Sequence, residues 1–170
     1  IATAAMEKGL FARTAETIGM AQRGGSVASH VRGGHPQSPL VPLGCADCII
    51  AFEPGEAVRC IGYLAPGGTV IVNTQAVQPP VAALQNIDYD GAEALSYLRS
   101  LPDIRLVEVD GASICDQVGS PKVLNIALLA AAVDSGTLGI TREELENAVR
   151  GRVHPRFHEM NLNAIALVCA

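Results

Sequence analysis

The residues with the clearest chemical potential stand at positions 22–26, where the sequence reads QRGGS. The two glycines accept positive φ angles and allow a ligand or another backbone to approach closely. Arg23 carries a planar guanidinium that binds a carboxylate or a phosphate through two parallel hydrogen bonds. The alternative is a surface turn in which Arg23 binds nothing, but a simple turn does not need glutamine, arginine and two glycines together. We predict a binding or interface turn made of Met20, Gln22, Arg23, Gly24, Gly25 and Ser26.

Cys45 and Cys48 form a C-x-x-C, which can serve as a redox dithiol or as half of a metal site. No second C-x-x-C follows, and no histidine stands at zinc-site spacing. Cys48 also lies in an apolar run, where cysteine behaves as a small apolar residue. We therefore expect no metal site, and we interpret Cys60, Cys115 and Cys169 as core residues.

Asn125 is a polar residue inside the apolar run from Val123 to Val133. A helix that is apolar all round is expected to be buried, and a buried amide must be hydrogen-bonded. We predict that Asn125 is a buried structural tie that holds a neighbouring loop, with ligand contact as the less favoured alternative.

Composition limits the classes of protein that fit this sequence. The 170 residues suit one domain, and 4% aromatic residues require an aliphatic core. The net charge of −5 argues against a general nucleic-acid binder, which normally carries a basic excess. With no signal peptide, no long apolar span and five cysteines, we expect a cytoplasmic protein with reduced thiols and no membrane partner.

The chain alternates between short apolar strands and helices. Strands are predicted at 10–17, 26–31, 46–53, 69–74 and 104–110, with those at 26–31, 46–53 and 69–74 buried. Helices are predicted at 1–8, 54–64, 92–100, 123–133, 141–151 and 155–168, with the 141–151 helix opened by a TREE capping box and closed by Gly151. Residues 35–44 read as a proline-rich loop, and APGG at 65–68 as a tight turn with a positive φ at Gly67 or Gly68.

This order predicts an α/β fold, namely a three-layer α/β/α sandwich with a Rossmann-like, mostly parallel sheet and a helical C-terminal end. Sites in such folds lie at the carboxyl ends of the strands. Glu53 follows one buried strand, and Asn73 and Thr74 end the next. We therefore add these three residues to the candidate site.

Five stretches resemble the gamma-type domain of the 2-oxoacid:ferredoxin oxidoreductases, nearest to its indolepyruvate members. They read ETIGMAQRGGSVASHVRGG, SPLVPLGCADCIIAFEPGEAVR, YLAPGGTVIVNT, GSPKVLNIALLAA and FHEMNLNAIA. The resemblance runs almost end to end, so we expect residues 1–170 to form one such domain. The family usually opens with a strand and a G-x-G-G-Q-G loop; neither is present, and we expect the chain to begin inside the family's first helix.

The resemblance implies that the complete enzyme oxidatively decarboxylates a 2-oxoacid, forms an acyl-coenzyme A and reduces ferredoxin. In this family thiamine diphosphate and iron–sulfur ([4Fe-4S]) clusters are held by other domains or subunits, and coenzyme A is expected on the whole complex. The sequence agrees, because it shows neither a four-cysteine cluster pattern nor a G-D-G followed by a distant N-N. The resemblance thus implies an accessory subunit that binds no cofactor, is inactive alone and assembles with a catalytic subunit.

On this basis we expect the turn at 22–26 to face the catalytic subunit, where Arg23 meets an acidic or phosphate group. Glu53, Asn73 and Thr74 are expected on the same sheet edge, near the approach of substrate or coenzyme A. An apolar face meant for a partner can also pair two copies of the isolated chain.

Two other classes stay open. LAPGGTVIVNT is similar to a late strand of nucleotide-fold methyltransferases, so a stand-alone enzyme of that kind is the second hypothesis. The third is a redox or metal protein that uses Cys45 and Cys48. Binding of S-adenosylmethionine would support the former, and metal analysis with a thiol count would support the latter.

Overall fold

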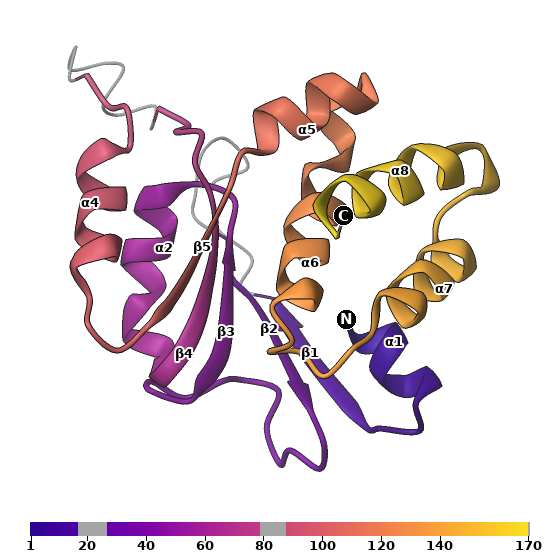
Figure 1. Ribbon diagram of the computed structural model, residues 1–170. Coiled ribbons are helices and arrows are strands. Elements are labelled where there is room, and N and C mark those ends of the chain that lie inside the picture. The colour runs from indigo at the N-terminus through magenta and orange to yellow at the C-terminus, as the bar shows by residue number, and fades with distance from the viewer. Residues whose placement is uncertain (17–26, 79–87, 170) are drawn as a thin grey trace.

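A computed structural model describes residues 1–16, 27–78 and 88–169 (Figure 1). Its strands are β1 (Ala12–Glu16), β2 (Ser29–Gly33), β3 (Ala46–Ala51), β4 (Leu64–Asn73) and β5 (Arg105–Val109). Its α-helices are α1 (Ala2–Glu7), α2 (Pro54–Cys60), α4 (Ala92–Ser100), α5 (Gly111–Val118), α6 (Leu124–Asp134), α7 (Arg142–Arg152) and α8 (His158–Val168). Single 3₁₀ turns, η1, η2 and η3, cover Ile61–Tyr63, Pro121–Val123 and Pro155–Phe157.

A three-stranded parallel sheet in the order β3-β4-β5 lies between two helical layers. Successive side chains of a strand point to opposite faces, and β4 is apolar on both. Val70 and Val72 pack with α2 and α4, whereas Ile71 packs with α6. Figure 1 shows α2 and α4 on one side of the sheet and α6 on the other. The predicted α/β layers are therefore confirmed for this part of the chain.

The two N-terminal strands differ from the prediction. β1 and β2 form a separate antiparallel pair, with Arg13 opposite Arg32 and Thr14 opposite Val31. The strand at 26–31 was predicted to be buried in the sheet, but the observed strand begins only at Ser29, and its residues are half-buried or exposed. The reason is that Ser29 and Arg32 give the strand no continuous apolar face, so it cannot occupy the interior of a layered sheet.

The positive φ predicted at Gly67 or Gly68 is confirmed at Gly67, but residues 65–68 belong to β4 instead of forming a tight turn before it. Gly67 has φ +75°, a conformation that other residues rarely adopt, and its N–H donates to the Asp103 carbonyl at 2.9 Å. Pairing with β3 already begins at Leu64, opposite Ala46, and the register shifts between Ala46 and Cys48. β4 therefore includes the turn residues as an irregular first part.

The C-terminal helices and α1 enclose a second core. Its buried members come from α1, α6, α7, α8 and the turn before α7, and they are Ala4, Ala130, Val133, Ile140, Leu145, Ala148, Val149 and Ile165. The TREE capping box is confirmed: Thr141 Oγ1 accepts from Glu144 N at 3.2 Å, and a Glu144 carboxylate oxygen accepts from Thr141 N at 2.8 Å. Within the described ranges no helix has the length and apolarity needed to cross a bilayer.

The structure corrects several helix predictions, and the helix expected at 54–64 already ends at Cys60. Gly151 does not close its helix, because α7 continues to Arg152 and ends at an extended Val153. Helix α5 was missed, although its ends carry ordinary signals. The Asp110 carboxylate accepts from Ser113 N at 3.0 Å, and Gly119 ends the helix with φ +78°. Its short, mixed sequence hides it from a periodicity search.

Candidate functional site

The carboxyl ends of β3, β4 and β5 meet at one edge of the sheet, and Asn73 joins them. Its Nδ2 donates to the Phe52 carbonyl at 3.1 Å, and its Oδ1 accepts from Gly111 N at 3.2 Å. A weaker contact at 3.5 Å joins Nδ2 to the Gln75 carbonyl. Because Asn73 is only 2% exposed and its amide is occupied at both ends, it fixes the segments that follow β3 and β5.

The hydrogen bond between Gly111 N and Asn73 Oδ1 requires glycine at position 111. A Cβ at Gly111 would overlap Leu124 Cδ1 and would lie 2.7 Å from Asn73 Oδ1. Gly111 is also the first residue of α5, so its N–H is not used inside that helix. Sequence analysis missed this residue, and the signal that pointed to it was the D-G pair after an apolar strand.

Glu53 is buried and serves as the N-cap of α2. Its carboxylate oxygens accept from Gly55 N at 2.8 Å and from Glu56 N at 2.9 Å. The Tyr89 hydroxyl donates to Glu53 Oε1 and lies 3.0 Å from Gly55 N. Glu53 therefore fills the N-terminal end of α2 with its own negative charge, which leaves that helix end unsuited to a second anion.

Tyr89 links the segment before α4 to this cap. Burial raises the pKa of its hydroxyl to about 12, and the hydrogen bond to Glu53 adds to the rise. The hydroxyl therefore stays protonated and donating at physiological pH. Sequence analysis did not single out Tyr89, because nothing in the local pattern links it to a residue 36 positions earlier.

Thr74 completes the same edge. Its N–H donates to the Val109 carbonyl at 2.9 Å, and its hydroxyl lies 3.4 Å from the same oxygen. The structure thus brings Glu53, Asn73 and Thr74 to one sheet edge. All three hold backbone in place there, and exposed Phe52 and Val77 lie beside them in the chain.

The predicted interface turn lies outside the described residues, and Arg23 is its charged member. This applies to Met20, Gln22, Arg23, Gly24, Gly25 and Ser26. The segment that contains them connects β1 to β2. Its position relative to the sheet edge therefore stays a prediction.

Asn125 corrects another prediction, because it is exposed rather than buried. Its Oδ1 accepts from Ile126 N at 2.9 Å, a contact within its own helix that holds no neighbouring loop. The apolar sequence at 123–133 led to a wrong prediction of burial at Asn125. In α6 the buried residues begin only at Ala127, while the first turn from Leu124 to Ile126 is exposed or half-buried.

Of the two cysteines in the C-x-x-C, Cys48 does not have the properties of a reactive thiol. Cys45 is exposed, while burial and then the charge of Asp47 raise the pKa of Cys48 to about 11. A thiol with such a pKa is neutral at physiological pH and is a weak nucleophile. Within residues 1–16, 27–78 and 88–169, no three histidine, cysteine or acidic side chains are placed to hold a metal ion.

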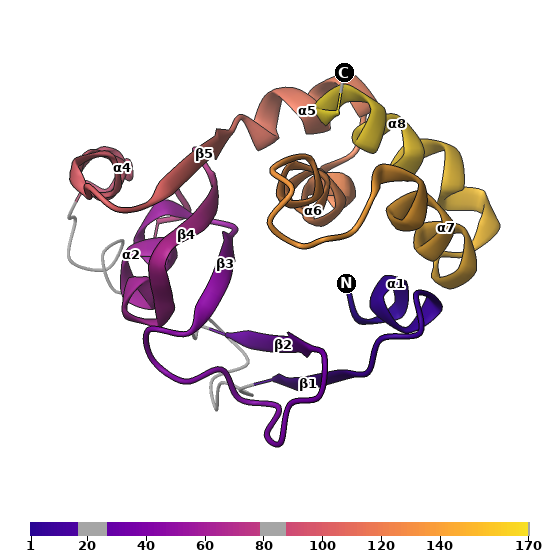
Figure 2. The same ribbon diagram turned by 60° about the horizontal axis from the view of Figure 1, so that its bottom comes forward.

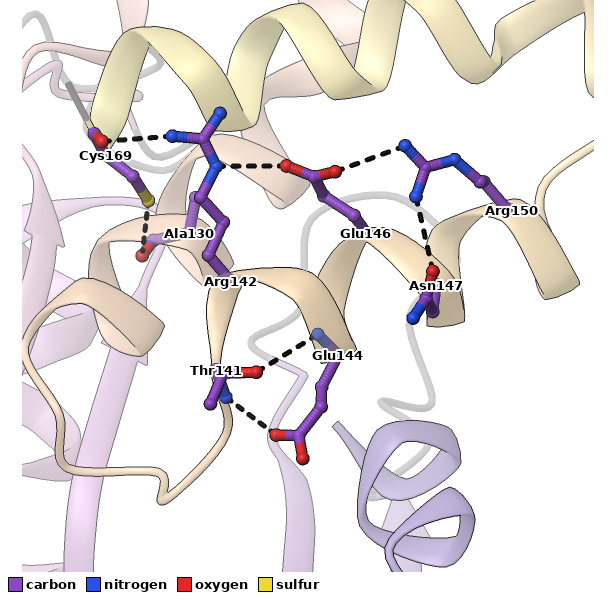
Figure 3. Close-up of polar contacts among 8 residues, drawn as sticks. All are labelled: Ala130, Thr141, Arg142, Glu144, Glu146, Asn147, Arg150 and Cys169. Atoms are coloured by element: carbon purple, nitrogen blue, oxygen red, sulfur yellow. Dashed lines mark hydrogen bonds and ion pairs between the residues drawn. The ribbon is translucent and has the colours of Figure 1, made fainter.

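Charged residues of α7 make contacts inside the chain. Figure 3 shows Glu146 between two arginines, with Arg142 Nε at 3.0 Å and Arg150 Nη2 at 3.2 Å. Arg142 Nη1 also donates to the Cys169 carbonyl at 3.2 Å, which joins α7 to the end of α8. The hydrogen bond from Arg142 is the main cause that lowers the pKa of Glu146. These side chains support the helical core rather than a ligand.

A shallow hollow of 480 Å³ lies at the opposite edge of the sheet, near the amino ends of the strands. Arg105 Nη1 donates to the Ser135 carbonyl at 2.6 Å across it, and the Thr69 and Thr137 hydroxyls are 2.8 Å apart. Its other lining residues are Asp47, Ala65, Pro66, Gly67, Gly68 and Gly136. Its polar groups largely bond to one another.

Comparison with known proteins gives a consistent set of relatives. The family model described as pyruvate ferredoxin/flavodoxin oxidoreductase matches residues 1–169. Indolepyruvate oxidoreductase subunit IorB of Archaeoglobus fulgidus is 36% identical over 98% of this chain and 83% of its own length. The protein of the same name from Methanothermobacter thermautotrophicus is 32% identical over 96% of this chain and 84% of its own.

Two solved structures share the fold. The gamma subunit of a keto/oxoacid ferredoxin oxidoreductase from Geobacter sulfurreducens matches with a TM-score of 0.68 and 22% identity, over 99% of this chain and 84% of that one. Pyruvate oxidoreductase subunit PORC from Thermotoga maritima matches with a TM-score of 0.64 and 19% identity, over 99% and 83% of the two chains. At these identities the likeness shows the fold alone.

Proposed function

Because this chain belongs to the pyruvate ferredoxin/flavodoxin oxidoreductase family, we propose that it is the accessory subunit of a 2-oxoacid:ferredoxin oxidoreductase of the indolepyruvate or aryl-pyruvate type. The single observation that carries the proposal is the end-to-end match at 36% identity with a protein named as an indolepyruvate oxidoreductase subunit. A second relative of that name supports the same type.

In the proposed reaction the whole complex converts a 2-oxoacid anion and coenzyme A into acyl-coenzyme A, carbon dioxide, a proton and two electrons. The two electrons released pass one at a time to two oxidised ferredoxins. Thiamine diphosphate supplies the carbanion chemistry, and the iron–sulfur clusters carry the electrons. In this proposal all of these groups belong to the catalytic subunit or to the assembled complex.

The cysteines of the chain do not fit an iron–sulfur cluster. A [4Fe-4S] cluster needs four converging thiolates. Here Cys48 lies in β3, Cys60 ends α2, Cys115 lies in α5 and Cys169 follows α8. Because no ligand group of three or more forms among the described residues, we derive no electron-transfer step through this chain.

The contribution that we propose for this chain is to present a fixed edge to the catalytic subunit. Asn73 and Gly111 hold the three strand ends in one arrangement, and Glu53 fixes the start of α2. We propose that the turn containing Arg23 meets a carboxylate or a phosphate of the assembled site. Such a group would come from the catalytic subunit or from coenzyme A.

The first test is purification of the tagged chain from its native cells under anaerobic conditions, with mass spectrometry of its partners. We expect a larger subunit that carries thiamine diphosphate and iron–sulfur clusters. The complex should reduce ferredoxin with an aryl pyruvate and coenzyme A, and the isolated chain should not. Recovery of the chain alone, with binding of S-adenosylmethionine, would instead support the methyltransferase hypothesis.

A further inference from the structure

The hairpin of β1 and β2 carries two arginines directly opposite each other. Arg13 pairs with Arg32 in the antiparallel register, which places both side chains on one face. Like charges in this arrangement destabilise a strand pair. Among the described residues, none of the ion pairs includes either arginine. Within the described part of the chain, these two positive charges on one face therefore have no ion-pair partner.

Both arginines are held in place by their neighbours. The Arg32 Nη1 donates to the Ser38 carbonyl at 3.0 Å and to the Leu40 carbonyl at 3.1 Å. Among the described residues, its Nε and Nη2 make no hydrogen bond and can serve other acceptors. The Arg13 guanidinium lies over the Phe11 ring, 5.2 Å from the centroid. Both guanidinium groups are thus oriented before any ligand arrives, which lowers the entropy cost of binding.

The proline-rich loop beside the hairpin presents apolar side chains from an ordered backbone. Val41 N donates to His30 Nδ1 at 3.2 Å, and Gly44 N donates to the Gly62 carbonyl at 3.0 Å. Leu40 is nevertheless 52% exposed, and Phe11 is 49% exposed. Figure 2 shows the hairpin and this loop together at one side of the molecule, away from α4 and α5. An ordered apolar surface beside fixed arginines is typical of a protein interface.

The distribution of charged residues around the hairpin indicates what kind of partner surface would bind there. No aspartate or glutamate occurs from residue 17 to residue 46, although the whole chain has 17 acids and 12 bases. In a two-fold dimer formed through this face, each copy would place its arginines against those of the other copy. A second copy of this chain is therefore a poor occupant. A surface that is apolar and acidic fits the face better.

We propose that Phe11, Arg13, Arg32 and Leu40, here called the hairpin face, dock an apolar and acidic segment of the larger subunit of the complex. This inference rests on the proposed function, since it takes that subunit as the occupant. Carboxylates of the partner neutralise the two arginines, and apolar side chains of the partner cover Phe11 and Leu40. The hairpin face thereby becomes an anchor between the subunits.

The test measures the affinity of the chain for the purified larger subunit at several NaCl concentrations. Arg13→Glu is the main variant, because the contact described for the Arg13 side chain is with the Phe11 ring and not with the proline-rich loop. We expect it to weaken the complex about tenfold or more and to flatten the salt dependence. Arg13→Lys should keep most of the affinity. Arg59→Glu, on an exposed position of α2, is the matched control and should bind like the parent chain.

Leu40→Asp tests the apolar part of the hairpin face independently of the arginines. The substitution leaves the backbone contacts of the loop in place. It should also weaken the complex about tenfold. Unchanged affinity of both Arg13→Glu and Leu40→Asp would overturn the inference while leaving the proposed function intact. So would a change in the self-association of the isolated chain, or phosphate binding by this face without an effect on the complex. If the parent chain binds no such subunit, the proposed function itself fails.

Discussion

At the scale of single residues, Arg23 carries the most specific expectation. If its guanidinium meets an acidic or phosphate group of the assembled site, Arg23→Ala should lower complex formation or coenzyme A-dependent turnover about tenfold or more. Affinity between subunits and steady-state kinetics with varied coenzyme A would separate the two effects. Arg59→Ala is the control, because Arg59 lies on the exposed side of α2. Parent-like values for both quantities would rule out the role of Arg23.

Substitution of Asn73 tests how much its two side-chain hydrogen bonds, to Phe52 and Gly111, stabilise the fold. Asn73→Asp keeps the shape but replaces the donor to the Phe52 carbonyl with a buried oxygen. We expect the free energy of unfolding to fall by about 2–4 kcal/mol, because an unpaired polar group is left in the interior. Urea denaturation followed by circular dichroism measures this loss. The same change at exposed Asn147 should alter stability by less than about 0.5 kcal/mol.

The raised pKa of Tyr89 leads us to expect that the free energy of unfolding depends on pH in the alkaline range. The pKa of its hydroxyl is about 12 in the folded chain and lies near 10 when unfolded. Between these values the folded chain keeps a proton that the unfolded chain loses, so stability must fall as pH rises from 10 to 12. Tyr89→Phe should be less stable than the parent at pH 8, and the difference should shrink across that range.

The control for this comparison is Tyr97→Phe, at an exposed position of α4. Chemical denaturation at several pH values gives the free energy of unfolding for each variant. The Tyr97→Phe variant shows the effect of removing a tyrosine hydroxyl that is not in contact with Glu53. A constant difference between Tyr89→Phe and the parent would show that the contact with Glu53 contributes no pH dependence.

At the scale of secondary-structure elements, two glycines at helix positions should respond to alanine in opposite ways. Gly111 opens α5 against Leu124 and Asn73, so Gly111→Ala should destabilise the chain by about 1–3 kcal/mol. Gly151 lies inside α7, and the nearest atom to an added Cβ there is Glu7 Oε1 at 4.0 Å. Gly151→Ala should therefore stabilise the chain by about 0.5–1 kcal/mol.

Thermal unfolding of the two alanine variants beside the parent provides this measurement. The comparison controls for composition, because both variants carry the same substitution within an α-helix. A loss of stability in Gly151→Ala would mean that the glycine serves the end of α7, as the sequence first indicated, although the structure extends the helix past it.

At the scale of the whole molecule, the chain is expected to act only in an assembly. Adding the purified chain to the purified larger subunit should raise ferredoxin reduction until the two are equimolar, with no further increase beyond that point. The chain alone should give no reduction with any aryl pyruvate. Full activity of the larger subunit by itself would remove the need for an accessory subunit.

The sequence by itself determined the parts of the fold that depend on local signals. The apolar runs at 46–53 and 69–74, the glycine pair at 67–68 and the TREE box at 141 each act through contacts within a few residues. The structure has a strand at each run, a positive φ at Gly67 and the capping box at Thr141. The family could also be identified from the sequence, because its motifs are short stretches that can be recognised without knowing the fold. The placement of Glu53, Asn73 and Thr74 at one edge followed from the geometry of parallel strands.

Only the tertiary structure decided what those residues touch. Tyr89 meets Glu53, Gly111 meets Asn73, and Arg13 stands opposite Arg32, yet each pair is separated by a stretch of chain that carries no matching signal. Asn125 was misjudged for the same reason, since its burial depends on whether other elements cover the first turn of α6. Local patterns record what a segment prefers, whereas partners and burial arise from packing between distant segments.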